Sequence, residues 1–186
     1  KNMDSKTEEQ INKASGRLIM ESGMEGFSLE KLSKQPEIIG FDLYALIRKK
    51  EEAFEKLLFA LERELKELIN GISSSQNSPA DEFEKLFKQL HRLFKQKPYY
   101  LTVIFDKDLR QLYSGADNII SRIKSMAEKY LTGLIDRGKA QKVFTLKTET
   151  KVLVEIILGS FQALMNNMQL ADNMVRDLKK NQSVTD

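Results

Sequence analysis

The side chains that most often carry enzyme chemistry are sparse in this sequence. Cysteine is absent and His91 is the only histidine, so neither a Cys–His pair nor a thiolate metal site can form. Scattered carboxylates around one histidine give no metal-ligand cluster, and no P-loop, G-x-S-x-G or H-E-x-x-H motif occurs. We therefore predict a protein that is not an enzyme and that needs no metal or cofactor, with His91 as a partly exposed polar residue of its helix.

Length, charge and hydropathy narrow the class of protein further. The 186 residues suit a small module joined to a larger helical body, and the lack of cysteine suits a reducing compartment. No stretch approaches the roughly 18 consecutive apolar residues of a membrane span, and residues 1–20 lack a signal-peptide core. A net charge of +3 does not by itself indicate a polyanionic partner. We expect a cytoplasmic protein with no membrane partner.

The elements that must position any functional group are predicted to be helices. Apolar residues recur at spacings of three and four, whereas period-2 runs of β-branched residues are missing, which predicts an all-α protein. A first helix is predicted from Ser5 to about Glu21, opened by a capping box of Ser5 and Glu8. A second follows Ser28 through Lys34, and a third spans about Ile38 to Leu46. These short helices predict an N-terminal module of residues 1–48.

Residues 49–186 are predicted to form a second, larger helical domain. A long helix spans about 49–72, and Ser78-Pro79 opens the next one, which ends in a bend at Pro98. A further long helix closes near Gly138. Between residues 152 and 165 apolar side chains occupy nearly every direction, which predicts one helix that is buried on two sides.

The span from Ile11 to Phe54 resembles the DNA-binding headpiece of the TetR family of transcriptional regulators. Residues 11–23 are similar to the first helix of that family and its E-x-G exit, and residues 27–29 (Phe-Ser-Leu) to its T-[ST]-[VI] entry. Leu43-Tyr44 falls at the LY of the recognition helix, and Lys50-Glu51 with Phe54 at the K-E-x-[LF] that opens the fourth helix. The resemblance implies an N-terminal three-helix helix-turn-helix headpiece on a larger ligand-binding and dimerisation domain.

The sequence departs from the family pattern in the turn. The family's A-G-V-S-x-G-[TS] reads P-E-I-I-G-F-D at residues 36–42, with Glu37 in place of the turn glycine. No Lys or Arg lies between Glu37 and Ile47, so the recognition helix carries no cation to read a guanine edge, and Asp42 would repel phosphates. Residues 1–50 hold nine basic and eight acidic side chains, which is little excess charge for binding phosphate.

The resemblance implies a ligand-responsive transcriptional regulator, a repressor, that binds double-stranded operator DNA as a homodimer and is released by a small apolar or aromatic ligand. The DNA-contacting residues that it implies are Ser28, Gly40, Phe41, Tyr44, Arg48, Lys49 and Lys50. In the alternative interpretation, the basic cluster only solvates a helix start and Tyr44 belongs to the core. The chain would then be a helical ligand-binding or protein-interaction dimer that has lost operator binding.

A TetR-like architecture also implies a ligand cavity in the larger domain. Its candidate lining residues bring aromatic rings, flexible methionine and few polar groups together around the Pro98 bend. They are Phe87, His91, Phe94, Tyr100, Ile104, Phe105, Tyr113, Met126 and Tyr130. The alternative is that these side chains form ordinary core.

The dimer interface is expected on the late apolar helix. Small residues there permit close helix approach, and large apolar ones supply area. The candidate residues are Ile156, Gly159, Ser160, Phe161, Ala163, Leu164 and Met165. The alternative is a monomer that buries all of them internally.

Overall fold

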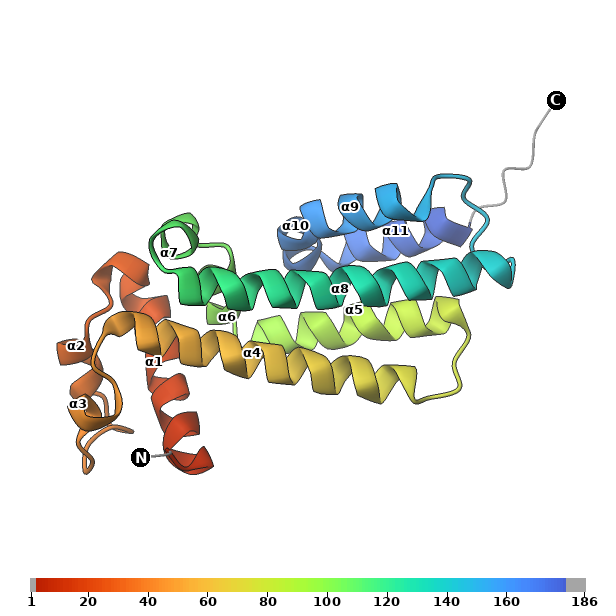
Figure 1. Ribbon diagram of the computed structural model, residues 1–186. Coiled ribbons are helices and arrows are strands. Elements are labelled where there is room, and N and C mark those ends of the chain that lie inside the picture. The colour runs from red at the N-terminus through yellow and green to blue at the C-terminus, as the bar shows by residue number, and fades with distance from the viewer. Residues whose placement is uncertain (1–2, 180–186) are drawn as a thin grey trace. The chain divides into compact units, whose positions relative to one another are not determined.

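The computed structural model describes residues 3–179, which form eleven helices and contain no strand (Figure 1). The predicted all-α class is confirmed. Among these residues, none of the helices combines the length and apolar character that crossing a membrane requires. The chain packs as two compact units that interleave along the sequence: residues 3–64 with 96–122, and residues 65–95 with 123–179.

The first unit contains the N-terminal helices and a middle segment of the chain. Its helices are α1 (Ser5–Gly26), α2 (Leu29–Ser33), α3 (Leu43–Leu46), the first part of α4 (Lys50–Ser73), α6 (Tyr99–Ile104), α7 (Lys107–Leu112) and the first part of α8 (Ser114–Ala140). Helix α1 packs on both α2 and α6. Helix α1 therefore forms the packing centre of the N-terminal helices. Among the later segments of the chain, α6 makes the most contacts with α1.

The N-terminus of α1 differs from the predicted capping box. Asp4 rather than Ser5 is the N-cap, and its carboxylate accepts a hydrogen bond from the Thr7 amide at 2.7 Å. A carboxylate satisfies a free amide at a helix start at least as well as a serine hydroxyl, and its charge suits the helix dipole. The helix continues to Gly26 across a kink at Gly23, which has φ of 70°.

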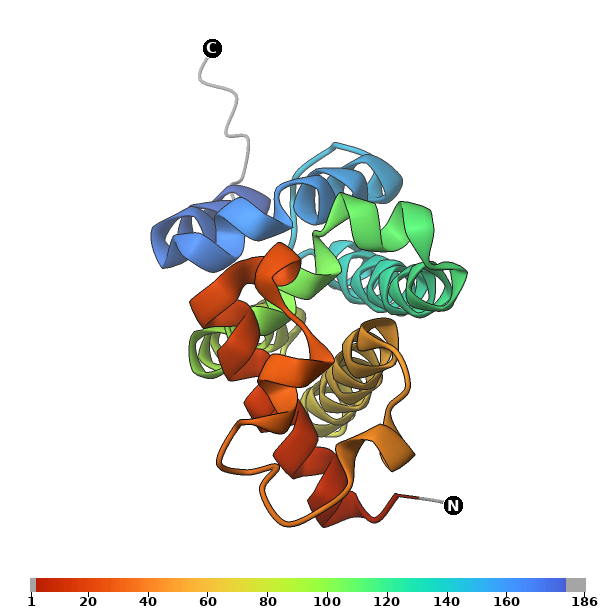
Figure 2. The ribbon, with the colours of Figure 1, turned by 90° about the vertical axis from the view of Figure 1, so that its left-hand side faces the viewer.

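The third helix is shorter than predicted. It was expected from about Ile38, but residues 36–40 form turns and α3 begins only at Leu43. Gly40 has φ of 109°, a left-handed conformation that interrupts a right-handed helix and that glycine adopts at little cost. Asp42 then caps α3 by accepting a hydrogen bond from the Ala45 amide at 3.4 Å. A loop of residues 34–42, visible at the lower left of Figure 2, therefore separates α2 from α3 and is longer than the connection predicted between Lys34 and Ile38.

The second unit contains the end of α4, helix α5 (Pro79–Gln96) and the end of α8, followed by α9 (Thr150–Gly159), α10 (Phe161–Asn166) and α11 (Met168–Lys179). Ser78 caps α5 as predicted, since its hydroxyl accepts from the Asp81 amide at 3.2 Å. The Phe83 ring packs edge-on to Phe144 with centroids 5.9 Å apart.

The single helix expected between Val152 and Met165 is broken. Helix α9 ends at Gly159 and α10 begins at Phe161, because Ser160 leaves helical geometry with φ −100° and ψ 4°. Glycine and serine are both poorer helix formers than the residues around them, so the break falls where helix propensity is lowest.

Candidate functional site

Helix α3 has one buried side and one exposed side. Leu43 and Ile47 are almost fully buried, and the Ile47 amide closes the turn by donating to the Leu43 carbonyl at 2.8 Å. Tyr44 and Ala45 point to the other side, and Tyr44 is 54% exposed. Tyr44 is therefore not a core residue, which removes that part of the alternative interpretation.

The other candidate DNA-contacting residues surround α3. Gly40, Arg48 and Lys49 are exposed, whereas Ser28, Phe41 and Lys50 are half-buried. Ser28 caps α2, because its hydroxyl accepts from the Lys31 amide at 3.1 Å.

Some of the charged side chains near α3 form ion pairs within the chain, and others do not. Lys34 pairs with Glu30 at 3.1 Å, and Arg17 pairs with Glu37. The Arg48 amide donates to Glu52 Oε2 at 3.0 Å, but across residues 3–179 no ion pair or hydrogen bond engages the side-chain cation of Arg48 or of Lys49. These two cations are thus available to an external anion beside the exposed face of α3.

A cluster around Glu64 joins α6 to α4 within the first unit. The Tyr100 hydroxyl donates to Glu64 Oε2 at 2.5 Å, and Lys97 Nζ lies 2.5 Å from Glu64 Oε1. Burial raises the pKa of Tyr99 to about 12, with a further contribution from the Glu64 charge. Burial and the hydrogen bond to Glu64 raise the pKa of Tyr100 as well. Both phenols therefore stay protonated at neutral pH, so Tyr100 remains a hydrogen-bond donor to Glu64.

The candidate cavity residues are distributed over both units. Tyr100, Ile104, Phe105 and Tyr113 belong to the first unit, and Phe87, His91, Phe94, Met126 and Tyr130 belong to the second. Several of those in the second unit make specific core contacts. Phe87 stacks on Phe83 with centroids 5.1 Å apart, and Phe94 packs edge-on to Phe161 at 5.7 Å.

Tyr130 belongs to a polar cluster in the second unit. Its hydroxyl donates to Glu82 Oε1 at 2.7 Å, and Arg137 donates to both oxygens of the same carboxylate at 3.1 Å. Glu82 is buried, so these bonds compensate the loss of its hydration. The pKa of Tyr130 is raised by burial and by its hydrogen bond to Glu82.

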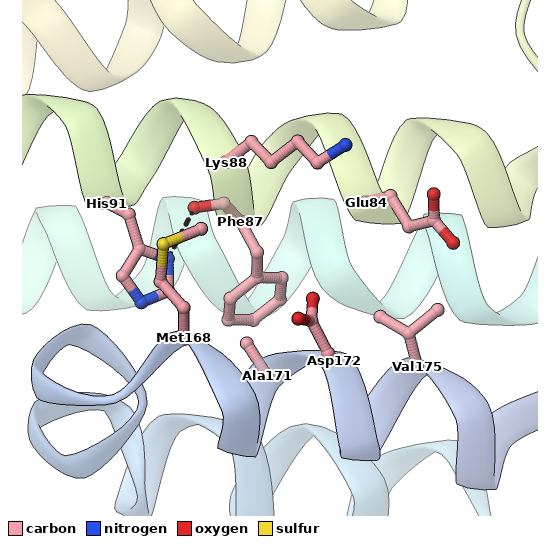
Figure 3. Close-up of a pocket in the computed structure, with 8 residues that line it drawn as sticks. All are labelled: Glu84, Phe87, Lys88, His91, Met168, Ala171, Asp172 and Val175. Carbon is pink, nitrogen blue, oxygen red and sulfur yellow. Dashed lines mark hydrogen bonds between the residues drawn. The ribbon is translucent and has the colours of Figure 1, made fainter.

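A small cleft lies between α5 and α11 in the second unit (Figure 3). Its lining residues are Glu84, Phe87, Lys88, His91, Met168, Ala171, Asp172 and Val175. Its volume is about 10 Å³, which is room for about one water molecule. Phe87 and His91 are the members of the candidate cavity set that line it.

His91 is buried, contrary to the prediction of a partly exposed side chain. Its Nδ1 lies 2.8 Å from the Phe87 carbonyl oxygen, and its Nε2 lies 2.6 Å from the Leu164 carbonyl oxygen near the end of α10. Both partners are acceptors, so a neutral ring can donate to only one of them at a time. Sequence pattern could not predict this contact, because Leu164 is 73 residues away. Within residues 3–179, no group of three metal-ligating side chains occurs.

The candidate dimer residues separate into outward and inward groups. Ile156 is 54% exposed, and Gly159, Ser160 and Ala163 are exposed beside it. Phe161 is half-buried, whereas Leu164 and Met165 are buried within this chain. Val152, which was not among the candidates, extends the exposed apolar face along α9.

Comparison with known proteins gives matches among solved structures. No family model matches the sequence, and no curated protein sequence matches it. The ketosteroid transcriptional regulator KstR2 of Mycobacterium tuberculosis superposes with a TM-score of 0.78 at 14% identity, covering 97% of this chain and 98% of that one. A TetR-family transcriptional regulator from Agrobacterium tumefaciens gives 0.77 at 14% identity, covering 94% and 98%.

A third structure contains bound molecules. It is AibR in complex with isovaleryl coenzyme A and operator DNA, with a TM-score of 0.73 at 16% identity, covering 93% of this chain and 98% of that one. At such identities the likeness is one of fold. This chain has the fold of the TetR-family transcriptional regulators.

Proposed function

We propose that this chain is a transcriptional regulator, a repressor, that binds double-stranded operator DNA through its headpiece as a homodimer. The observation that carries the proposal is the exposed face of α3 at Tyr44, next to the cations of Arg48 and Lys49, which have no partner within the described residues. A tyrosine hydroxyl and nearby cations are the groups that contact DNA phosphates. Ser28, Gly40, Phe41 and Lys50 complete the proposed contact surface.

We assign DNA binding to residues 1–48 and ligand binding with dimerisation to residues 49–186. Two helices, α4 and α8, run from one compact unit into the other, so a change in one unit has a continuous route to the second. The two compact units are defined by contacts between residues, so their bounds differ from those of the two proposed functional domains.

A ligand-responsive role is supported by the neighbour that carries both isovaleryl coenzyme A and operator DNA. The cleft of about 10 Å³ does not admit a molecule of that kind. An apolar or aromatic ligand that entered this cleft would have to displace the Phe87 ring, and the cost of that displacement would couple binding to a change of conformation.

The proposed dimer uses the exposed face of α9 and α10. Val152 and Ile156 supply apolar area, and Gly159, Ser160 and Ala163 allow a second copy to approach closely. Leu164 and Met165 are buried within the chain and belong to the core beneath this exposed face.

The DNA-binding proposal is tested with a fluorescein-labelled duplex from the region upstream of this protein's own gene. Anisotropy titrations of the full chain should show binding that weakens with added salt. Tyr44→Ala and Lys49→Ala should each weaken it several-fold, whereas Lys129→Ala, an exposed lysine of α8, should not. Absence of binding even at low salt would instead favour a ligand-binding or protein-interaction dimer of the same fold.

A further inference from the structure

The segment from Ile39 to Ala45 exposes several apolar residues, together with Asp42 and Tyr44. Ile39 is 73% exposed, the largest exposure among the big apolar side chains of residues 3–179. Gly40 and Ala45 are exposed, and Phe41 is half-buried beside them. An exposed aliphatic side chain gains by leaving water, so this surface favours an apolar partner.

The polar groups of the same segment are few and mostly engaged. Between residues 37 and 47 there is no Lys, Arg, Asn or Gln, so the groups that form paired hydrogen bonds with guanine or adenine are missing. Glu37 is bound by Arg17, and Asp42 is used as the cap of α3. The Tyr44 hydroxyl is left as the exposed side-chain donor of the segment.

The major groove of DNA has one strongly apolar feature, the C5-methyl group of thymine. Resting on the function proposed above, we propose that residues 39–45 read thymine methyl groups, so that the operator has A·T pairs where it faces Ile39 and Ala45. Arg48 and Lys49 would then supply phosphate contacts, which set affinity without regard to sequence. Specificity would come from apolar contact and not from hydrogen bonds to base edges.

The test begins with selection of binding sites by the full chain from a pool of random duplexes. The selected duplex is then synthesised with deoxyuridine in place of single thymidines, which removes only the methyl group. Each contacted methyl should be worth roughly a three- to fivefold change in Kd. Replacing such a T·A pair by 5-methylcytosine·G should keep more affinity than replacing it by C·G.

A pair of variants assigns the effect to this segment. Ile39→Ser should abolish the difference between thymine and uracil at one position of the site. Leu112→Ser, in which an aliphatic side chain of α7 with 70% exposure is changed in the same way, should keep that difference. Both side chains are exposed, so neither change should prevent folding.

The outcomes separate the two proposals. If the chain retains duplexes but uracil substitution has no effect, or if the facing positions are guanines, thymine reading is wrong and the regulator remains. If no duplex is retained even at low salt, the proposed regulator is wrong and thymine reading is wrong with it.

Discussion

The aromatic ring of Tyr99 lies against the backbone of Gly16, so close that a Cβ on residue 16 would overlap the ring. This contact is part of the packing of α6 against α1. Gly16 is fully helical and buried, where any larger residue would have to push Tyr99 away.

Gly16→Ala should therefore destabilise the protein although alanine is the better helix former. Overpacking of this kind typically costs roughly 1–3 kcal/mol. Gly133→Ala in α8 is the matched control, because nothing lies within 4 Å of its Cβ position. The control should gain up to about 1 kcal/mol from helix propensity. Urea unfolding measures both, and equal effects of the two changes would contradict the contact.

Alkaline pH should weaken the fold through Tyr99. Burial raises the pKa of Tyr99 to about 12 from its ordinary value of 10.0, so the unfolded chain loses this proton first. Stability from this group is complete below pH 10 and is lost as pH rises through about 12. Tyr100 and Tyr130 act in the same direction.

Unfolding curves of the wild type and Tyr99→Phe between neutral pH and pH 12 measure this effect. The variant lacks the phenol, so its stability should fall less steeply above pH 10. If the stability of wild type and of Tyr99→Phe fell equally with pH, the pKa of Tyr99 would be the same in the folded and the unfolded chain.

His91→Ala should destabilise the second unit. The change removes the ring whose two nitrogens contact the Phe87 and Leu164 carbonyl oxygens, and it leaves a cavity between α5 and α10. A buried carbonyl without its donor costs roughly 1–3 kcal/mol. Arg92→Ala, an exposed neighbour on α5, should have little effect. Guanidinium unfolding compares them, and equal stabilities would mean that the His91 contact contributes nothing.

Ile156→Glu should dissociate the proposed homodimer. The side chain is exposed in the single chain, so a carboxylate there is tolerated by the fold but not by an apolar interface. Light scattering after gel filtration should give two chains for the wild type and for Lys129→Glu, and one chain of 21.4 kDa for Ile156→Glu. A wild type that elutes as a monomer would remove the proposed interface.

The helices were predictable because their apolar spacing depends only on nearby residues. Ser78 and Pro79 marked the start of α5 correctly for the same reason. Local pattern failed at α3, where a helix was predicted from about Ile38, whereas the exposed Ile39 lies in a turn and the left-handed Gly40 was not anticipated.

Contacts between distant residues could not be predicted. His91 looked like a surface residue because its partner, the Leu164 carbonyl, is a backbone group far along the chain. The aromatic residues around Pro98 were grouped by type, yet Tyr100 bonds Glu64 in one unit while Tyr130 bonds Glu82 in the other. Only the packing of helices decides such pairings.

The most direct test of DNA binding by the headpiece is site-specific crosslinking. The chain has no cysteine, so Ala45→Cys, on the exposed side of α3, can be labelled at a single position with a benzophenone. The labelled protein should crosslink to the selected duplex on irradiation, and labelled Lys129→Cys should not. Crosslinking from residue 129 and none from residue 45 would contradict the placement of DNA at α3.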